Sequence, residues 1–153
     1  PIGTYSFNEA EIRFQSGQVR KFWGTIGYRS GGFYDGHRQQ ETAGIGWRPS
    51  SHFQLTLDYT VNDVELPYGD FNTELIQLRS DIIFSSTMSW STLLQYDNLT
   101  ETLGINTRLH WIPKAGQEGI IVLNHNLQDT ELNNRFKSTL ADLAVKFNYT
   151  FRF

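Results

Sequence analysis

Hydrophobic and polar residues alternate most strictly at the end of the chain, between Leu143 and Phe153. The odd-numbered positions carry Leu, Val, Phe, Tyr, Phe and Phe, and the even-numbered positions carry Ala, Lys, Asn, Thr and Arg. A period of two residues predicts a β-strand with one apolar and one polar face. A long apolar strand promotes aggregation in water, whereas a closed barrel turns such a face to lipid. The pattern therefore predicts an all-β protein: a transmembrane β-barrel or part of one.

Eight further segments show the same alternation, so we expect an antiparallel up-and-down barrel. Most of the predicted spans are near the length that a tilted strand needs to cross a bilayer. Trp23 falls on the polar face of its strand, and the apolar run from Ile120 to Leu123 leaves the facing of its strand open. The predicted strands are residues 6–14, 19–29, 37–48, 52–61, 72–85, 88–96, 101–112, 118–128 and 143–153.

The connections between these segments predict an orientation. The last strand of an outer-membrane barrel ends in the periplasm, and periplasmic turns are shorter than extracellular loops. Counting back from the C-terminus, we expect short periplasmic turns at Gly17, Pro49, Ser85 and Pro113. Polar loops are expected on the extracellular side over residues 30–36, 62–70 and 129–137, with a further connection near Asn98.

The predicted strand number is odd, whereas bacterial barrels with both termini in the periplasm have an even number. Either the first segment does not span, which leaves an eight-stranded barrel, or further strands precede Pro1. We favour the second explanation, in which residues 1–153 form one domain, the C-terminal portion of a larger barrel. The chain starts without Met, so we expect a removed leader or a fragment.

Composition is compatible with a barrel and excludes other classes. The 153 residues include no Cys, carry a net charge of -3, are 14% aromatic and contain no apolar run long enough for a helical span. The mean hydropathy of -0.43 is no objection, because alternating strands dilute the apolar signal. No basic cluster favours nucleic acid, and no cofactor is expected.

The polar faces of the predicted strands carry charges of both signs. In a barrel these residues line a water-filled passage, or they fill a narrow interior with ion pairs that conduct nothing. Mixed signs argue against strong ion selectivity. The predicted lumen-lining residues are Arg13, Arg29, Arg48, Asp58, Arg79, Asp81, Arg108, Asp142, Lys146 and Arg152.

Aromatic residues on the apolar faces fit the girdles that anchor barrels at the two membrane interfaces. The predicted girdle residues are Tyr28, Trp47, Phe53, Tyr59, Trp90, Tyr96 and Trp111. The four His residues lack metal-ligand spacing, and we predict no metal site; the acidic group between Asp63 and Glu74 is expected to be a solvated loop. His110 and Asn106 share a face and leave a barrel hydrolase open as a weak alternative.

Three stretches carry a resemblance to a known family: Leu94–Tyr96, Leu103–Pro113 and the terminal Phe151–Phe153. They resemble the end of a Gram-negative outer-membrane family that has an N-terminal domain similar to family-nine carbohydrate-binding modules and an uncharacterised barrel. The resemblance implies that the carbohydrate-binding domain and earlier strands lie upstream of Pro1. It supplies no reaction.

The terminal strand also resembles the signal that the barrel assembly machinery reads, which ends in aromatic residues. An apolar strand with an open edge can pair with a sheet edge of that machinery. Asn148 stands where Gly is usual. The predicted signal comprises Lys146, Phe147, Asn148, Tyr149, Phe151 and Phe153.

We therefore expect an outer-membrane protein with a periplasmic C-terminus, in contact with the lipid bilayer and lipopolysaccharide. The first hypothesis for its function is a passage for solutes, with saccharides as candidate cargo. The second is a structural barrel that binds a partner and conducts nothing, and the third is the membrane-embedded hydrolase. A soluble ligand-binding barrel is the rival at the level of fold.

Overall fold

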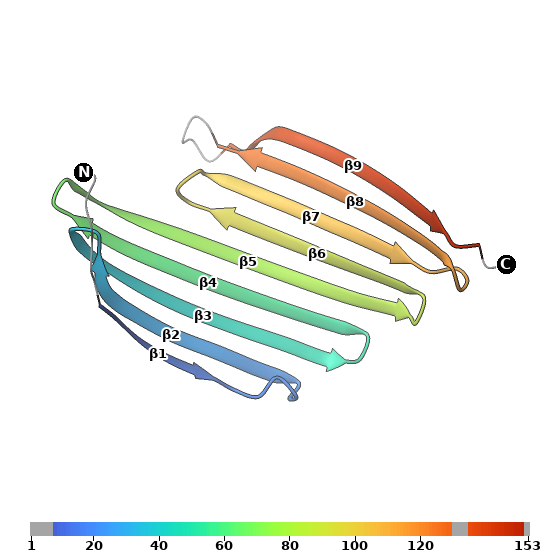
Figure 1. Ribbon diagram of the computed structural model, residues 1–153, viewed down its shortest axis with the longest axis horizontal. Helices are drawn as coiled ribbons and strands as arrows, with labels where there is room; N and C mark the ends of the chain where they lie inside the picture. Colours follow the sequence, from blue (N-terminus) through green and yellow to red (C-terminus); the bar gives the residue numbers. More distant parts are fainter. Residues whose placement is uncertain (1–7, 130–134, 152–153) are drawn as a thin grey trace.

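The computed structural model describes residues 8–129 and 135–151, which form a single sheet of nine antiparallel strands (Figure 1). Each strand pairs with its neighbours in the chain, so the sheet follows the sequence from β1 to β9. The predicted all-β, antiparallel, up-and-down architecture is confirmed. Among the described residues, no helix is long and apolar enough to cross a membrane.

All nine predicted segments contain a strand. Ser6 and Phe7, at the start of the first predicted strand, lie outside the described residues. The strands are β1 (Glu9–Gln15), β2 (Phe22–Phe33), β3 (Gly36–Ser50), β4 (Phe53–Leu66), β5 (Gly69–Ser85), β6 (Met88–Asp97), β7 (Thr102–Trp111), β8 (Gln117–Gln128) and β9 (Lys137–Tyr149).

The sheet has two ends, which differ in the connections that they carry. The outer end holds the connections 34–35, 67–68, 98–101 and 129–136. The inner end holds the connections 16–21, 51–52, 86–87 and 112–116, together with the end of β9. Figure 1 shows the C-terminal end of β9 at the same side as the β3–β4, β5–β6 and β7–β8 turns.

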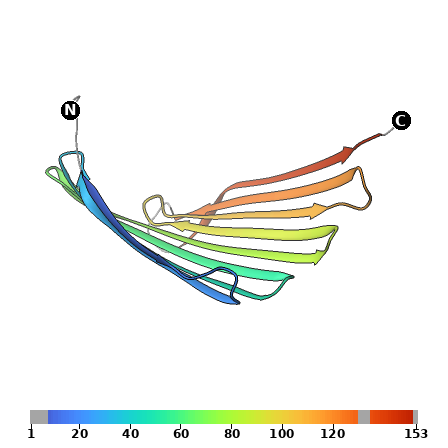
Figure 2. The same ribbon diagram turned by 60° about the horizontal axis from the view of Figure 1, so that its bottom comes forward.

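The sheet is curved and staggered, as Figure 2 shows. A row of paired residues that starts at Phe22, the first residue of β2, passes through Trp47, Leu55, Ser80, Thr92, Thr107 and Leu123 and arrives at Leu143. Leu143 lies in the middle of β9. The row therefore drifts along the strands, which is the stagger that accompanies tilted strands in a barrel wall.

The sheet has no packed core. Its accessible surface is 11132 Å², whereas a globular monomer of 17.7 kDa exposes about 8,000 Å². Val64, at 4% exposure, is the only buried apolar side chain among the described residues. Stability in this architecture must come from the strand pairing and from whatever covers the two faces.

The pairing register sorts the side chains into an apolar face and a polar face. Strand β8 shows how it resolves the ambiguous run: Ile121 and Leu123 lie beside Val145 and Leu143, whereas Ile120 and Val122 lie on the opposite face, beside Lys146 and Ala144. Away from the register shifts near the ends of β3, β5 and β8, the apolar face is formed by one parity on each strand, and large exposed side chains gather there. They include Ile12, Phe14, Phe22, Ile26, Ile45, Leu57, Ile76, Trp111, Leu143, Val145 and Phe147.

Both edges of the sheet are open among the described residues. Strand β1 pairs only with β2, and β9 pairs only with β8. Because an up-and-down sheet reverses direction at every strand, β1 and β9 run in the same direction. Joining these two edges by antiparallel pairing therefore needs an odd number of further strands between them.

The predicted difference between short inner and long outer connections is wrong. Polar loops were expected over residues 30–36 and 62–70, but β2 and β3 are joined by residues 34–35, and β4 and β5 by residues 67–68. Polar residues continue the ladder there: Asn62 donates to Thr73 at 3.0 Å, and Asn72 donates to Asp63. Hydrogen bonds across the strands keep these polar segments extended, which hydrophobic alternation alone does not detect.

The predicted C-terminal end of the last strand is also wrong, whereas the strand starts where the expected loop ends, at Lys137. Strand β9 begins at Lys137 and ends at Tyr149, where its partner β8 begins with Gln117. One further backbone bond, from the Thr150 N–H to the Gly116 carbonyl at 2.7 Å, closes the ladder. Alternation continues to Phe153 in the sequence, but a strand persists only as far as it has a partner to pair with.

Candidate functional site

The polar face gathers the residues that were predicted to line a lumen. The cross-strand register and the contacts of Arg48 place nine of them on this one face: Arg13, Arg29, Arg48, Asp58, Arg79, Asp81, Arg108, Asp142 and Lys146. Arg152 lies outside the described residues. The polar face is the candidate site, because the apolar face offers no comparable set of ionisable groups within its apolar band.

Strands β1 to β3 hold their charges in ion pairs that cross the strands. Arg29 meets Glu11 at 2.6 Å, and Arg38 meets Glu9 at 2.6 Å. Glu9 was expected on the polar face of the first strand, whereas Arg38 was not among the predicted lining residues, because position 38 fell next to an expected loop. Since all four side chains remain partly exposed, water screens these pairs, and each one contributes little to stability.

Trp23 is a large aromatic residue on the polar face, where the alternating pattern of the sequence would place a polar residue. Its indole lies over Gly46, where a Cβ atom would overlap the ring. The Arg48 guanidinium lies 5.3 Å from the ring centroid and donates through Nε to Gln54 at 2.8 Å. An aromatic residue on a polar face is thus accommodated by a glycine beneath it and a cation beside it.

A hollow of ≈ 430 Å³ lies toward the inner end of the polar face, on β5, β6 and β7. Its charged and titratable lining residues are Arg79, Asp81, Arg108 and His110. Arg79 is paired with Asp81 at 3.1 Å, whereas Arg108 has no hydrogen bond or ion pair with another described residue. This hollow therefore offers one cation free to meet a solute.

A hydrogen-bonded chain ties the last three strands together near the inner end. Nε2 of His110 in β7 contacts Oε1 of Glu118 in β8 at 2.8 Å. Nδ2 of Asn148 in β9 donates to the other oxygen of Glu118 at 2.9 Å. His110 is thus engaged with a carboxylate on the polar face.

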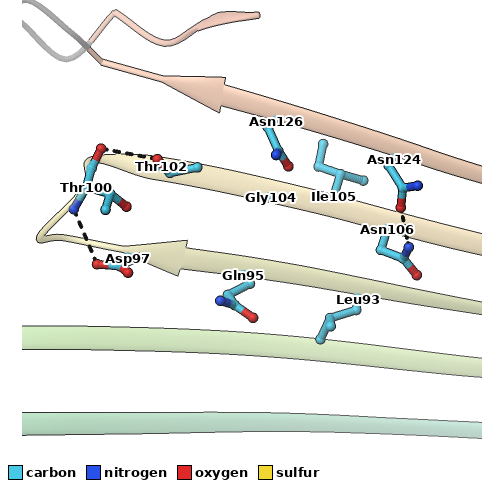
Figure 3. Close-up of a pocket in the computed structure, with 10 residues that line it drawn as sticks. All are labelled: Leu93, Gln95, Asp97, Thr100, Thr102, Gly104, Ile105, Asn106, Asn124 and Asn126. Atoms are coloured by element: carbon cyan, nitrogen blue, oxygen red, sulfur yellow. Dashed lines mark hydrogen bonds between the residues drawn. The ribbon is translucent and has the colours of Figure 1, made fainter. Parts of the chain in front are cut away.

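A second hollow, of ≈ 290 Å³, lies toward the outer end on β6, β7 and β8 (Figure 3). Its most numerous polar side chains are carboxamides, contributed by Gln95, Asn106, Asn124 and Asn126. Gln77 on β5 extends the group by donating to Gln95 at 3.0 Å. We call these five residues the amide cluster.

The amide cluster was not predicted from the sequence. Its members are spread along the chain: Gln95 follows Gln77 by 18 residues, and Asn126 follows it by 49. No local motif therefore joins them. A usable signal exists: amides recur at polar-face positions of successive strands. Reading it requires the facing of β8, which the run from Ile120 to Leu123 conceals.

The apolar face carries all seven predicted girdle residues, in two rows. Tyr28, Tyr59 and Tyr96 lie toward the outer end, and Trp47, Phe53, Trp90 and Trp111 lie toward the inner end. Phe53 and Tyr59 are separated by about 20 Å along β4, as six residues of extended chain require. The inner row is in contact laterally: Trp47 stacks on Phe22 at 6.1 Å and meets Phe53 edge-on at 5.7 Å.

A group of polar atoms extends from the inner aromatic row toward the middle of the apolar face. Nε1 of Trp90 donates to the hydroxyl groups of Thr92, at 3.0 Å, and Thr107. The two hydroxyls also contact each other at 2.8 Å. Each of these polar atoms is therefore satisfied by another protein atom.

Two further His residues each contact a serine hydroxyl. His37 contacts Ser30 at 2.8 Å and His125 contacts Ser138 at 2.9 Å, but no third described side chain is hydrogen-bonded to either imidazole. Within residues 8–129 and 135–151, no three His, Asp or Glu side chains are grouped so as to hold a metal ion. The acidic residues between Asp63 and Glu74 lie on the extended β4–β5 hairpin rather than in a loop.

The predicted assembly signal is divided by the end of β9. Lys146, Phe147, Asn148 and Tyr149 belong to the strand, and Phe151 follows it with its ring 4.4 Å from that of Tyr149. Phe153 lies outside the described residues. Nearly all of β9 is exposed, which agrees with its position at an open edge.

Comparison with known proteins gives neighbours in fold. No family model and no curated protein matches the chain, so the resemblance to the outer-membrane family with a carbohydrate-binding domain stays a prediction. Two solved structures have a similar arrangement of strands, both at 11% identity and a TM-score of 0.49: a KdgM porin, with 95% of this chain and 78% of that chain covered, and a KdgM porin in complex with disordered oligogalacturonate, with 98% and 80% covered. At this identity the similarity concerns fold alone.

Proposed function

We propose that this chain forms the wall, or part of the wall, of an outer-membrane β-barrel through which small polar solutes pass, with saccharides as the solute class. One observation carries the proposal: a single sheet presents an exposed apolar face and, on the other side of the same strands, a face of charged and amide side chains. This division suits a wall between lipid and water.

The apolar face supports the lipid side of the proposal. Ile26, Ile45 and Val145 are 68%, 65% and 69% exposed, with no layer of the described chain above them. A contiguous apolar surface of this extent is unfavourable in water and favourable against hydrocarbon. The two aromatic rows would then lie at the two interfaces, with the outer row in contact with lipopolysaccharide.

The open edges bear on the size of the barrel. Since β1 and β9 run in the same direction, an antiparallel wall closes only through additional strands. The proposal therefore keeps the prediction that residues 1–153 are the C-terminal portion of a larger barrel. In this orientation the inner end and the C-terminus face the periplasm.

The end of β9 is also proposed to act in the assembly of the barrel in the membrane. The exposed edge of β9, followed by Phe151, fits a strand that the barrel assembly machinery captures by edge pairing. Deleting Phe153 is expected to lower the amount of protein inserted in the outer membrane, measured by fractionation and by resistance to urea extraction. Unchanged insertion would contradict an assembly role for the terminal residues.

Ion current and solute flux test the passage directly. The full-length protein is inserted into planar bilayers, and in parallel into liposomes whose swelling reports entry of mono- and disaccharides. We expect discrete conductance steps and saccharide entry, neither of which should occur with the heat-unfolded protein. Folded protein that gives neither current nor swelling would reject the passage and favour a structural barrel that anchors a partner.

A further inference from the structure

The amide cluster is a group of carboxamides on the polar face with charged residues at its borders: Asp58 lies beside Gln77, and Arg79 and Asp142 end the row that holds Asn106 and Asn124. Gln77, Gln95 and Asn126 lie in one row across the sheet, with Gly104 between the last two, and Asn106 and Asn124 lie side by side in the row two residues further in. Four members line a hollow of ≈ 290 Å³ from three adjacent strands: Gln95, Asn106, Asn124 and Asn126. Gln77 lies beside Gln95 on the next strand. That volume is enough for a sugar ring.

The cluster has hydrogen-bonding capacity that its own contacts leave unused. Each carboxamide offers two N–H donors and a carbonyl oxygen that can accept two bonds. Gln77 donates to Gln95 and Asn106 donates to Asn124, which uses one group of each residue. The Asn126 carboxamide makes no hydrogen bond to another described side chain. Donors and acceptors are therefore available together at the surface of the hollow.

Gly104 shapes the floor of the hollow. It lies between Gln95 and Asn126 on the polar face, and a Cβ atom there would stand 3.5 Å from the Asn126 oxygen. Without that Cβ atom, the two amides border an open patch of backbone. Figure 3 shows Gln95, Gly104 and Asn126 across this floor, with Asn106 and Asn124 beside it.

The lining supplies no counter-charge for an anionic solute. Asp97 is the only ionisable residue that lines the hollow, and its Oδ1 accepts from the backbone N–H groups of Leu99 at 2.8 Å and Thr100 at 3.4 Å. The free cation Arg108 lines the inner hollow instead. A hydroxyl both donates and accepts, as a carboxamide does, whereas a carboxylate only accepts and needs a donor of opposite charge.

We infer that the amide cluster is a binding subsite for an uncharged, hydroxyl-rich solute, namely a neutral oligosaccharide. This inference rests on the proposed function, because it takes the polar face to be the lining of the passage. The subsite holds the solute near the outer end by hydrogen bonds between carboxamides and sugar hydroxyls. An oligosaccharide that carries carboxylates is expected to bind more weakly there.

Calorimetric titration of the full-length protein in detergent tests the subsite independently of conduction. The probes are maltotriose and a hexuronate trisaccharide of the same length. The test variant combines Asn124→Ala with Asn126→Ala, and the matched control is Gln40→Ala, which removes a polar-face carboxamide on β3.

We expect maltotriose to bind the wild-type protein at least tenfold more tightly than the hexuronate trisaccharide does. The double variant should lose about tenfold in maltotriose affinity, as removal of two hydrogen-bonding groups predicts, and Gln40→Ala should leave affinity unchanged. Equal affinity in the double variant, stronger binding of the hexuronate, or no binding of maltotriose would overturn the subsite. A protein that binds maltotriose but passes no current would keep the subsite and reject the passage.

Discussion

The two faces of this sheet satisfy their polar atoms in different ways. On the polar face, Arg29 and Glu11 form a partly exposed pair, and Arg108 has no partner among the described residues. On the apolar face, the indole N–H of Trp90 and the hydroxyls of Thr92 and Thr107 bond to one another. The polar face thus leaves a charged group unpaired, whereas these three polar groups of the apolar face are satisfied internally. Ser80, beside Thr92 on the apolar face, has no side-chain hydrogen bond with another described residue.

Under the proposed function, this difference reflects the surroundings of each face. Hydrocarbon offers no hydrogen bonds, so a polar atom on a lipid-facing surface needs a partner within the protein. Water supplies partners freely, so an unpaired Arg or Asn on a lumen-facing surface costs little. The contrast therefore separates a membrane wall from a soluble sheet covered on both sides, and it can be tested by placing the same change on either face.

The largest effect is expected from a charge placed in the middle of the apolar face. Leu57, between Ile45 and Leu78 in the register, is 38% exposed. Leu57→Arg should lower the free energy of unfolding in lipid vesicles by about 2–4 kcal/mol, because the guanidinium must enter hydrocarbon. Urea titration of the vesicle-inserted protein, followed by tryptophan fluorescence, measures the loss.

Thr60→Arg is the control for this charge, because Thr60 lies on the same strand and on the polar face, beside Thr42 and Leu75. We expect a change within about 1 kcal/mol, since the new side chain can reach water. Equal losses from the two substitutions would mean that the apolar face does not meet lipid.

A smaller effect is expected where the polar face holds its one large aromatic residue. Gly46→Ala places a methyl group where the Trp23 indole lies, so it should cost about 1–3 kcal/mol of stability by overpacking. Gly27→Ala is the matched control, because the nearest atoms to a Cβ there are at 3.8 Å. The same urea titration compares the two variants.

A double-mutant cycle identifies the cause of the Gly46 effect. In a Trp23→Ala background the added methyl group has room, so Gly46→Ala should lose most of its cost. If Gly46→Ala still lowers the stability when the indole is absent, the backbone conformation requires the glycine, and room for the Trp23 ring is not the reason for it.

Much of this fold could be predicted from the sequence, because alternation is a local property. The nine strands, their order and the facing of residues such as Leu57 and Asp58 follow from it. The turn at residues 67–68 could not be predicted, because Asn62 and Asp63 are polar and their extension depends on the partners Thr73 and Asn72. The local pattern of hydrophobic and polar residues does not show which positions of neighbouring strands pair with each other.

The same reason explains why the candidate site was predicted only in part. The charged residues of the polar face were found because each lies on a clearly alternating strand. The amide cluster was missed because Asn124 and Asn126 follow the run from Ile120 to Leu123, whose facing is fixed only by pairing with β7 and β9. Trp23 likewise has an exceptional position that only Gly46, on the next strand, explains.

The smallest effect is expected from substitutions of the hydroxyl residues that accept from the Trp90 indole on the apolar face. The informative quantity is whether the effects of the single substitutions add. Thr107→Val removes one of the two acceptors of the Trp90 N–H and leaves Thr92 in place. This change should cost about 0.6 kcal/mol, the usual scale for a hydrogen bond in a membrane. With Thr92→Val added, the indole N–H has no acceptor left among the described side chains.

The double variant should therefore cost more than the sum of the single ones, by about 1 kcal/mol, if hydrocarbon surrounds the indole. If water surrounds it, a solvent molecule replaces each lost hydroxyl and the two costs simply add. The urea titration in vesicles distinguishes these outcomes. Additive costs would place this face in water and, together with a harmless Leu57→Arg, would reject the lipid-facing assignment on which the barrel wall depends.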